Sequence, residues 1–471
     1  MIGSEKRYHF VGIGGTGMSG LASVLLSEGA SISGSDLREC REIGMLREAG
    51  AAIELGHDPH HVNRPLDGII VSSAVAQDNV EVIAAKKREI PVFYRLHALA
   101  SLLACYQSIG IAGTHGKSTT SAMTATILRE QGRDPSYLIG AHCPALGGNA
   151  HRGEGDWFVA EIDESDGRFL AVRPSIAVVT NIGKDHLQTY RNLAEIEGAF
   201  RHYATQADRA VLATDDPHVA SLARIVPDAM TVGLNADARL RAERVRHCRF
   251  AMEFDLHLDG TPITHVRLPA PGEHNVRNAL CALGTAILAG VDLHQAAEAL
   301  ESFVLPHRRF ELLEENGVTV IDDFAHLPEE VEATLHAIRS GWPARRVVAV
   351  FQPHRYSRTR DLGAEFGDAF RGADVAVVTS IYAADEAPLP GVTSRVVVDA
   401  IRAKTNADVY SIPDKPSVVA FLEERIEPGD FIVSFGAGDV WTVTESLASF
   451  LIDGRFLKKH SGQSSTRRSN S

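Results

Sequence analysis

Short apolar runs alternate with amphipathic stretches along most of the chain, and this alternation predicts repeated strand and helix units. Over residues 7–95 the runs YHFVGIG, ASISGSD, AAIELG, GIIVSSA and IPVFY are separated by helical stretches such as 20–28 and 80–87. Short buried strands that alternate with helices are typical of a parallel sheet. We therefore expect a small parallel α/β domain in this part of the chain.

Two further series of the same kind follow. The second begins with SIGIAG at 108–113 and continues with DWFVAEID, SIAVVTNI and ADRAVLATDD. Its character changes near Leu240: apolar and polar residues then alternate around Asp259 and Gly260, which indicates a hairpin at the edge of a mixed sheet, and a helix over 274–290 follows. The third series begins near Pro306 and contains the strands VTVIDDFA, RVVAVFQP, VAVVTSI, DVYSI and DFIVSFGAG.

The length of 471 residues agrees with about three domains, since one core rarely serves so long a chain. We expect domains over 1–102, 103–305 and 306–457. The polar, unpatterned tail 458–471 is expected to be disordered.

Composition narrows the class of protein. The chain is 44% hydrophobic and 23% charged, as in ordinary soluble globular proteins. Its net charge of -13 argues against a general affinity for nucleic acid or anionic membranes. The five cysteines are scattered without CxxC spacing, which favours neither a disulfide framework nor a zinc site, and no apolar run resembles a signal peptide or a membrane span. These features predict a cytoplasmic protein with neither a nucleic-acid nor a membrane partner.

The first strand leads into a glycine-rich loop, GIGGTGMSG, at residues 12–20. Gly12, Gly14 and Gly17 fit the pattern G-x-G-x-x-G, and Asp36 follows about twenty residues later, where an acidic side chain can bind ribose hydroxyls. The loop alone leaves three interpretations open: a nicotinamide dinucleotide site, a site for another nucleotide diphosphate, or a tight turn between strand and helix.

The sharpest signal is GTHGKSTT at residues 113–120. A strand, a glycine turn, Lys117, Ser118 and a helix follow one another, which is the layout of a P-loop that binds nucleotide phosphates and Mg²⁺. The strict eight-residue pattern fails because Ile111 stands where it requires glycine. Either the loop is a shortened variant that binds ATP, or it is a turn with a solvated lysine. The predicted ATP-binding residues are Gly113, Thr114, His115, Gly116, Lys117, Ser118 and Thr119.

Candidate magnesium ligands follow the neighbouring strands. Glu161 and Asp163 end one apolar strand, and Asp185 and His186 lie beyond the next. Strand ends of an open parallel sheet converge on the usual ligand crevice, so Ser118, Glu161 and His186 are predicted to meet at one Mg²⁺. Taken singly, each also fits a solvated turn or a hydrogen-bonding loop residue.

Two further groups are less specific. Asn275 and Asn278 lie three apart on one helix face, where they could pair with adenine or act as an N-cap and a packing residue. Arginines in PHRRFE and FQPHRYSRTRD suit carboxylate or phosphate recognition, or a salt-bridged loop.

Taken together, these motifs resemble those of the Mur ligases. The resemblance covers about residues 7–453, and its order is far more specific than any single loop. It rests on HFVGIGGTGMSGLA, SGSD, IVSSAV, GTHGKSTT, EIDESD, TNIGKDH, EHNVRNA, HRRFE, IDDFAHLP, VFQPHRYSRTRDL, YAADEAPLPG and GAGDVWTV.

The resemblance implies an N-terminal Rossmann-like domain for a UDP-sugar, a central P-loop ATPase with a mixed sheet, and a C-terminal Rossmann-like domain that closes over ATP and the amino acid. It also implies residue roles. Lys117 contacts the ATP phosphates, and Ser118, Glu161 and His186 serve magnesium. Asn275 and Asn278 lie on the adenine side, Arg309 and Asp323 reach the nucleotide, and His326, Arg355 and Arg358 lie near the amino acid. The predicted UDP cradle consists of Gly12, Gly14, Gly15, Gly17, Asp36, Ser72 and Ser73.

The implied reaction is an ATP-dependent amide ligation in peptidoglycan precursor synthesis. The last three motifs favour L-alanine as the amino acid and UDP-N-acetylmuramate as its acceptor, with ATP and Mg²⁺ as cofactors and a monomer or homodimer as the working form. The lactyl carboxylate would be activated as an acyl phosphate before the amine attacks it.

Some positions depart from the family pattern. The family usually has Tyr-Gly-His-His after the paired aspartates, where this chain has Phe324, Ala325, His326 and Leu327, and it usually has Asp in place of Gln188. The first departure leaves the identity of the amino acid open. A related ligase with another amino acid, peptide or nucleotide sugar, and a non-catalytic nucleotide sensor, remain the alternatives, while a nicotinamide oxidoreductase is disfavoured.

Overall fold

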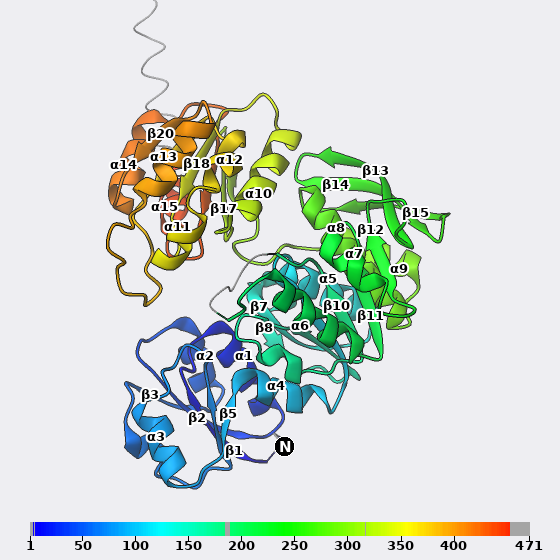
Figure 1. The fold of residues 1–471 in the computed structure, drawn as a ribbon, viewed down its shortest axis with the longest axis vertical. Coiled ribbons are helices and arrows are strands. Elements are labelled where there is room, and N and C mark those ends of the chain that lie inside the picture. The colour runs from blue at the N-terminus through cyan, green and yellow to red at the C-terminus, as the bar shows by residue number, and fades with distance from the viewer. Residues whose placement is uncertain (1–2, 4, 184–188, 316, 453–471) are drawn as a thin grey trace, which may run out of the picture. The chain divides into compact units, whose positions relative to one another are not determined.

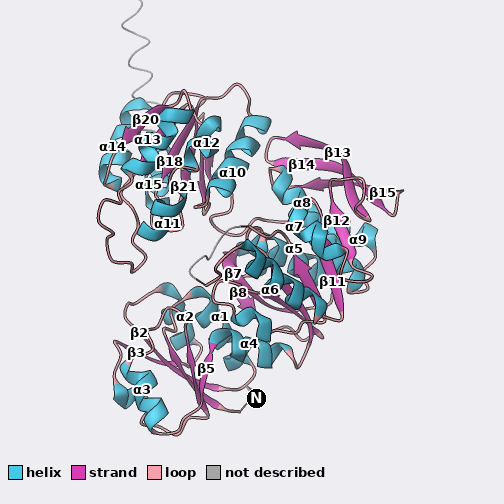
Figure 2. Ribbon diagram, viewed as in Figure 1, coloured by secondary structure: helices cyan, strands magenta, loops and turns pink. Residues whose placement is uncertain are grey.

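The computed structural model describes residues 3, 5–183, 189–315 and 317–452, and its strands form three sheets that follow one another along the chain (Figures 1 and 2). This is the three-domain α/β architecture that the sequence pattern predicts. The chain divides into two compact units. The first holds residues 1–246, 253–269 and 274–306, and the second holds 247–252, 270–273 and the residues from 307 onward.

The first sheet is entirely parallel, with the strand order β3-β2-β1-β4-β5. All five strands expected over residues 7–95 are present. The strands are β1 (Arg7–Val11), β2 (Ser31–Asp36), β3 (Ala52–Leu55), β4 (Gly68–Val71) and β5 (Val92–Tyr94). The helices are α1 (Thr16–Ser27), α2 (Arg41–Glu48), the 3-10 turn η1 (Pro59–Val62), α3 (Val80–Lys87) and α4 (Arg95–Leu103).

The second sheet has ten strands in the order β15-β14-β13-β12-β11-β10-β6-β9-β7-β8. Its middle strands are parallel, and β7 and β8 are antiparallel, so the sheet is mixed as expected. The strands are β6 (Gln107–Ala112), β7 (Ser136–Cys143), β8 (Gly148–His151), β9 (Trp157–Glu161), β10 (Ile176–Val179), β11 (Arg209–Ala213), β12 (Met230–Gly233), β13 (Leu240–Cys248), β14 (Ala251–Leu258) and β15 (Thr261–Leu268). The helices are α5 (Lys117–Glu130), α6 (Leu193–Thr205), α7 (Pro217–Ala223), α8 (Glu273–Leu288) and α9 (Leu293–Ala299), with 3-10 turns at Pro144–Leu146, Arg168–Ala171 and Leu300–Ser302.

The predicted turn at Asp259 and Gly260 joins β14 to β15. Both residues have positive φ, 47° and 81°, which is the backbone of the two-residue turn that suits the twist of paired strands. This edge of the sheet holds three strands and not a single hairpin, because β13 begins at Leu240, where the sequence pattern changes.

The third sheet has the order β16-β17-β21-β18-β19-β20. The edge strand β16 is antiparallel to β17, and the other neighbouring strands are parallel to one another. Its strands are β16 (Glu311–Glu315), β17 (Thr319–Asp323), β18 (Val347–Phe351), β19 (Val375–Val378), β20 (Asp408–Ser411) and β21 (Phe431–Phe435). Its helices are α10 (Pro328–Gly341), α11 (Tyr356–Leu362), α12 (Phe366–Ala369), the 3-10 turn η5 (Phe370–Gly372), α13 (Arg395–Lys404), α14 (Lys415–Arg425) and α15 (Trp441–Ile452).

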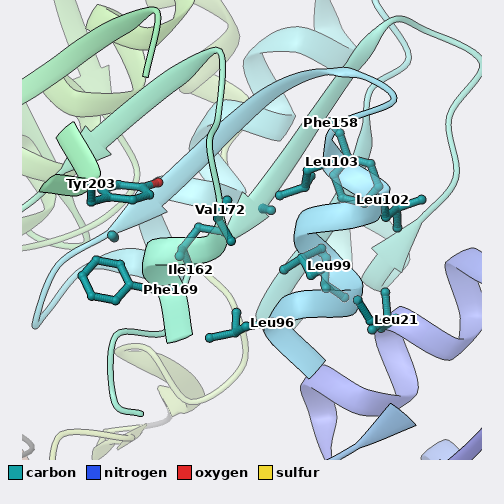
Figure 3. Close-up of a cluster of buried hydrophobic side chains, with 14 of the residues drawn as sticks. Leu21, Leu96, Leu99, Leu102, Leu103, Phe158, Ile162, Phe169, Val172 and Tyr203 are labelled. Carbon is teal, nitrogen blue, oxygen red and sulfur yellow. The ribbon is translucent and has the colours of Figure 1, made fainter. Parts of the chain in front are cut away.

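Within the first compact unit, one apolar core runs from the first sheet into the second. Leu21 of α1 and Leu99 and Leu103 of α4 belong to the same buried cluster as Phe158 of β9 (Figure 3). Each of these side chains is at most 1% exposed. Burying one such side chain stabilises the fold by about 2 kcal/mol. Because the α4 leucines share a core with α1 on one side and β9 on the other, α4 is packed against both domains of this unit.

No helix among the described residues is long and apolar enough to cross a membrane.

Candidate active site

The turn between β6 and α5 is the predicted P-loop. Gly113 and Gly116 have φ values of +140° and +80°, which L side chains rarely adopt. A Cβ at Gly113 would collide with the Thr180 hydroxyl, and a Cβ at Gly116 would collide with the Asn278 carboxamide. The turn therefore requires glycine at both positions, although Ile111 breaks the strict pattern.

The end of β10 holds the P-loop in shape. Asn181 Oδ1 accepts a hydrogen bond from His115 N at 2.8 Å, and the Thr180 hydroxyl donates to His115 O at 2.6 Å. Gly183 N donates to the Thr114 hydroxyl at 2.7 Å. Thr180 and Asn181 were not singled out in the sequence, although they stand in the TNIGKDH motif.

Lys117 extends back across this turn toward an acidic side chain. Its Nζ donates to Thr114 O at 3.2 Å and lies 3.1 Å from each oxygen of Glu164, a carboxylate that is almost fully buried. Burial alone lowers the pKa of Lys117, but Glu164, Glu161 and Asp163 outweigh it and hold the pKa above its ordinary value. Lys117 is thus a fixed positive charge beside the predicted phosphate-binding turn, and its partner Glu164 was not singled out in the sequence.

Two of the three predicted magnesium ligands meet. The Ser118 hydroxyl donates to Glu161 Oε2 at 2.7 Å, and Gly140 N donates to the same oxygen at 2.8 Å. A Cβ at Gly140 would stand 2.6 and 2.7 Å from the two Glu161 oxygens, so glycine is needed to admit this carboxylate. The third predicted ligand, His186, lies outside the described residues.

Asn275 and Asn278 lie at the start of α8, and both are buried. Asn278 Nδ2 donates to Asn275 Oδ1 at 3.2 Å, and the Thr120 hydroxyl donates to Asn278 Oδ1 at 3.4 Å. The pair therefore packs against the P-loop helix beside Gly116. Its role in adenine binding stays a prediction.

The glycine-rich loop of the first sheet is shaped by Asp36. Gly14 N donates to Asp36 Oδ2 at 2.8 Å, and Leu37 N donates to Oδ1 at 2.7 Å. A Cβ at Gly14 would lie 3.0 Å from both Asp36 Oδ2 and Cys40 Sγ. Here Asp36 bonds to the backbone of the loop, which gives it a structural role that the dinucleotide pattern did not indicate.

The other predicted cradle residues lie around this loop. Gly12 has φ +78°, and a Cβ there would lie 3.3 Å from Ser72 Cβ at the end of β4, while Ser73 follows in the same exposed turn. Gly15 is the N-cap of α1. The structure thus brings Ser72 beside the glycine loop, and the role of these residues in UDP binding stays a prediction.

Arg95 connects the glycine loop with the acidic motif of the second sheet. A Cβ at Gly17 would lie 2.8 Å from Arg95 Nη1, and Arg95 Nη2 donates to Asp163 Oδ2 at 3.2 Å. Burial raises the pKa of Asp163, but Arg95 and Lys117 outweigh it and lower that pKa, so Asp163 is ionised. Arg95 was missed in the sequence, where YRLHALA carries no phosphate-binding pattern.

In the second compact unit, Asp323 holds the turn that carries Arg309. Its carboxylate accepts from Phe310 N at 3.0 Å and from Ala325 N at 2.8 Å, and the Arg309 guanidinium lies 4.8 Å above the Phe324 ring. The adjacent Arg308 of the PHRRFE motif donates to Asp322 at 2.7 Å, as in the salt-bridged alternative.

The buried Asp323 carboxyl should make the stability of the protein depend on pH. Burial raises its pKa to about 6, although backbone hydrogen bonds and Arg309 oppose this. Since the folded state holds this proton more tightly than the unfolded state, the contribution of Asp323 to stability falls as pH rises from about 4 to about 6, by about 3 kcal/mol in total.

The variant Asp323→Asn lacks this titration. The free energy of unfolding of the variant, relative to that of the wild type, should therefore be higher at pH 7 than at pH 4, by about 3 kcal/mol. Denaturant unfolding of both proteins at the two pH values measures the difference. An equal stability gap at both values would contradict the assignment.

Aromatic and basic side chains gather after β17 and β18. The His326 ring lies 5.5 Å from the His354 ring, which stacks on Tyr382 at 5.7 Å. Arg358 Nη1 lies 3.1 Å from His354 Nδ1. The structure thus brings His326 and Arg358 together around His354, which stands in the FQPHRYSRTRD motif, and it adds Tyr382 from a distant segment with no spacing signal.

Arg355 stands in the same loop in an unusual conformation. Its φ is +68°, and its N–H donates to Tyr382 O at 2.8 Å. Such backbone strain in a non-glycine residue is typical of functional turns.

A P-loop with its charged lysine, a serine and carboxylate pair beside it, and a second glycine loop on an adjoining parallel sheet define a multidomain P-loop protein. The chain belongs to the Mur ligase family. Models described as the Mur ligase family catalytic domain, the Mur ligase middle domain, and the Mur ligase glutamate ligase domain match residues 7–107, 111–286 and 308–438.

Relatives and solved structures agree with this assignment. The chain is 42% identical over 457 residues to the UDP-N-acetylmuramate–L-alanine ligase of Pelobacter propionicus, covering 96% of this chain and 99% of the relative. It is 43% identical over 452 residues to the enzyme of the same name from a Geobacter species, covering 95% and 98%. The crystal structure of UDP-N-acetylmuramate–alanine ligase MurC from Thermotoga maritima superimposes with a TM-score of 0.81 and 28% identity, covering 98% of this chain and 100% of that one.

Proposed function

We propose that this chain is an ATP-dependent ligase that joins L-alanine to the lactyl carboxylate of UDP-N-acetylmuramate, in peptidoglycan precursor synthesis. The observation that carries the proposal is the group formed by Lys117, Ser118 and Glu161 at the P-loop. This group of residues lies in a chain that is similar over nearly its whole length to proteins named UDP-N-acetylmuramate–L-alanine ligase.

Lys117 supplies the charge that ATP requires. Its ammonium is already held by two backbone carbonyls and Glu164, so it needs little rearrangement to neutralise the terminal phosphates. Backbone N–H groups at the start of α5 add further positive potential.

Mg²⁺ fits the oxygens beside Lys117. Ser118 Oγ and Glu161 Oε2 are hard ligands 2.7 Å apart, and Gly140 leaves room for the carboxylate. When bound there, Mg²⁺ would neutralise phosphate charge as the γ-phosphate is transferred. In this proposal Ser118 and Glu161 hold the ion, together with His186.

The reaction joins two anions, so the main tasks of the protein are positioning and charge neutralisation. The lactyl carboxylate attacks the γ-phosphorus and ADP leaves, which gives an acyl phosphate. The neutral amine of L-alanine then attacks the acyl carbon, phosphate leaves, and the amine loses a proton. Lys117 stabilises the transferred phosphoryl group, and the arginines of the second unit are suited to the carboxylate of the amino acid.

The substrates are assigned to the remaining predicted residues. The UDP diphosphate binds at Gly12, Gly14, Gly15 and Gly17 with Ser72 and Ser73. L-Alanine binds near His326, Arg355 and Arg358. Phe324 and Leu327 lack the polar groups usual in the family, so the choice of amino acid is tested directly.

Purified protein with ATP, Mg²⁺ and UDP-N-acetylmuramate provides that test. Phosphate release that requires L-alanine is expected. Release with glycine, L-serine or a peptide instead would favour a related ligase, and no release with any of them would favour a nucleotide sensor. Reduced nicotinamide should be neither bound nor oxidised.

The glycine loop can be tested apart from the P-loop. Gly14→Val places methyl groups against Asp36 and Cys40, and crowding of this kind costs about 1–3 kcal/mol. Binding of the UDP-sugar should weaken about tenfold or more, while ATP binding stays nearly unchanged, as isothermal titration calorimetry would measure. Gly44→Val is the matched control, because a Cβ at Gly44 meets open space. An equal loss of affinity for the UDP-sugar and for ATP would contradict the assignment of the glycine loop to the UDP-sugar.

A further inference from the structure

Histidines and a glutamate from separate segments meet inside the first domain. Glu81, in the first turn of α3, is fully buried. Its Oε2 lies 3.6 Å from His9 Nε2 of β1 and 3.3 Å from His57 Nδ1, and its Oε1 lies 2.5 Å from His61 Nδ1 of η1. None of these side chains has a part in the proposed reaction.

The ring of His9 is oriented by its neighbour Ser33. The Ser33 hydroxyl donates to Tyr8 O at 3.4 Å, so it accepts from His9 Nδ1 at 3.0 Å. The proton of a neutral His9 is then on Nδ1, and the lone pair of Nε2 faces the Glu81 carboxylate. Nε2 is buried and has no hydrogen-bond partner among the described residues. Two electron-rich atoms face each other, which is unfavourable unless a cation lies between them.

The spacing favours a metal ion as that cation. At 3.6 Å, Nε2 and Oε2 are too far apart for a good hydrogen bond. Two ligands of one tetrahedral zinc ion lie about 3.4 Å apart, because zinc bonds nitrogen and oxygen at about 2.0–2.2 Å. One ligand atom from each of His9, His61 and Glu81 lies within 4.8 Å of the others. Only the partly exposed His61 ring, now hydrogen-bonded to Glu81, must move back by about 1 Å.

We propose that His9, His61 and Glu81 bind one Zn²⁺ at a structural site separate from the Ser118 and Glu161 pair. Imidazole nitrogens suit zinc and disfavour magnesium. His57 Nδ1 lies 3.0 Å from the Ser35 hydroxyl, whose own proton goes to Glu81, so His57 donates to Ser35 and the fourth position of the zinc is left to a water.

Outer hydrogen bonds complete the arrangement. Ser33 orients His9, and the Ser35 hydroxyl donates to Glu81 Oε2 at 2.6 Å, as partners of zinc ligands commonly do. Ser35 O also accepts from Gly12 N and Ile13 N at 2.9 and 3.1 Å. Bound zinc would therefore tie η1 and α3 to the strands that carry the glycine loop.

The test uses full-length protein without an affinity tag, stripped with a chelator and titrated with Zn²⁺ against a chromophoric zinc chelator. One equivalent should bind tightly and raise Tm by several degrees, and Co²⁺ in its place should give the intense visible absorption of a tetrahedral site. His61→Asn should abolish this equivalent. His60→Asn, at the exposed neighbouring position, should retain it.

Either of two results would overturn the proposal. If the wild type binds no stoichiometric zinc, the cluster is a hydrogen-bond network without a metal. If His61→Asn binds zinc as the wild type does, the ion lies elsewhere. His61 is partly exposed in η1, so its replacement tests the site even if Glu81→Gln fails to fold. Because no substrate is present, neither result bears on the ligase activity.

Discussion

Lys117→Ala should lower kcat for phosphate release by at least about a hundredfold, because a fixed charge aimed at the transferred phosphoryl group is lost. Nζ is held by Thr114 O and Glu164, and its raised pKa keeps it charged at neutral pH. Phosphate release at saturating ATP, UDP-N-acetylmuramate and L-alanine measures the effect. Lys415→Ala, which removes another ion-paired lysine 2.7 Å from Asp439, should leave turnover nearly unchanged.

A second variant separates catalysis from folding. Removing Lys117 takes a charge from beside the buried carboxylate of Glu164, which costs about 3–5 kcal/mol of stability. The double variant Lys117→Ala with Glu164→Gln removes that carboxylate charge as well. It should recover part of the stability and none of the activity. Near-normal turnover in either variant would remove Lys117 from the mechanism.

Glu161→Gln should also lower turnover by about a hundredfold, and it should shift the Mg²⁺ requirement to higher concentration. Glutamine keeps the size of the side chain and can still accept from Gly140 N, but it lacks the negative charge that a divalent cation requires. Titrating phosphate release with Mg²⁺ measures both changes. Glu154→Gln, at an exposed position, is the control.

Gly140→Ala tests the same site without touching a ligand. Its new Cβ would stand within 2.7 Å of both Glu161 oxygens, so the carboxylate must move. Displacing a supporting contact of a metal ligand commonly costs about 10–100-fold in affinity or activity. Gly198→Ala, where a Cβ meets open space, should behave as the wild type does. An unchanged Mg²⁺ dependence in both Glu161→Gln and Gly140→Ala would refute the magnesium assignment.

The fold was largely predictable because buried parallel strands carry strong local signals. The strands of the first sheet were recognised from apolar runs between helices, and α3 was expected at its observed position. Among the strands that were missed, β12 and β16 have weak patterns. β16 carries Glu311, Glu314 and Glu315 at a sheet edge, and β12 has only four residues. β16 lies at a sheet edge, where no continuous apolar run is required, whereas β12 lies between β11 and β13 and is too short to show a period.

The site was predictable where its residues stand in recognisable motifs. Lys117 and Ser118 stand together in GTHGKSTT, and their roles were inferred from that spacing. Gly140 and Arg95 come from distant segments with no motif of their own, and only the fold brings them to Glu161 and Asp163. The same limit applies to His9, His61 and Glu81. The scattered cysteines gave no indication of zinc, and histidines so far apart have no recognisable spacing.

The position of α4 has a practical consequence for dissecting this protein. Its leucines are covered on one side by the first sheet's helix α1 and on the other by side chains of the second sheet. A fragment cut after residue 102 would expose an apolar stripe that the intact chain hides, and would tend to associate through it. The amide hydrogens of α4 should consequently exchange as slowly as those of the cores on either side of it. The two domains would then open together, and their amides would exchange with one common free energy of opening.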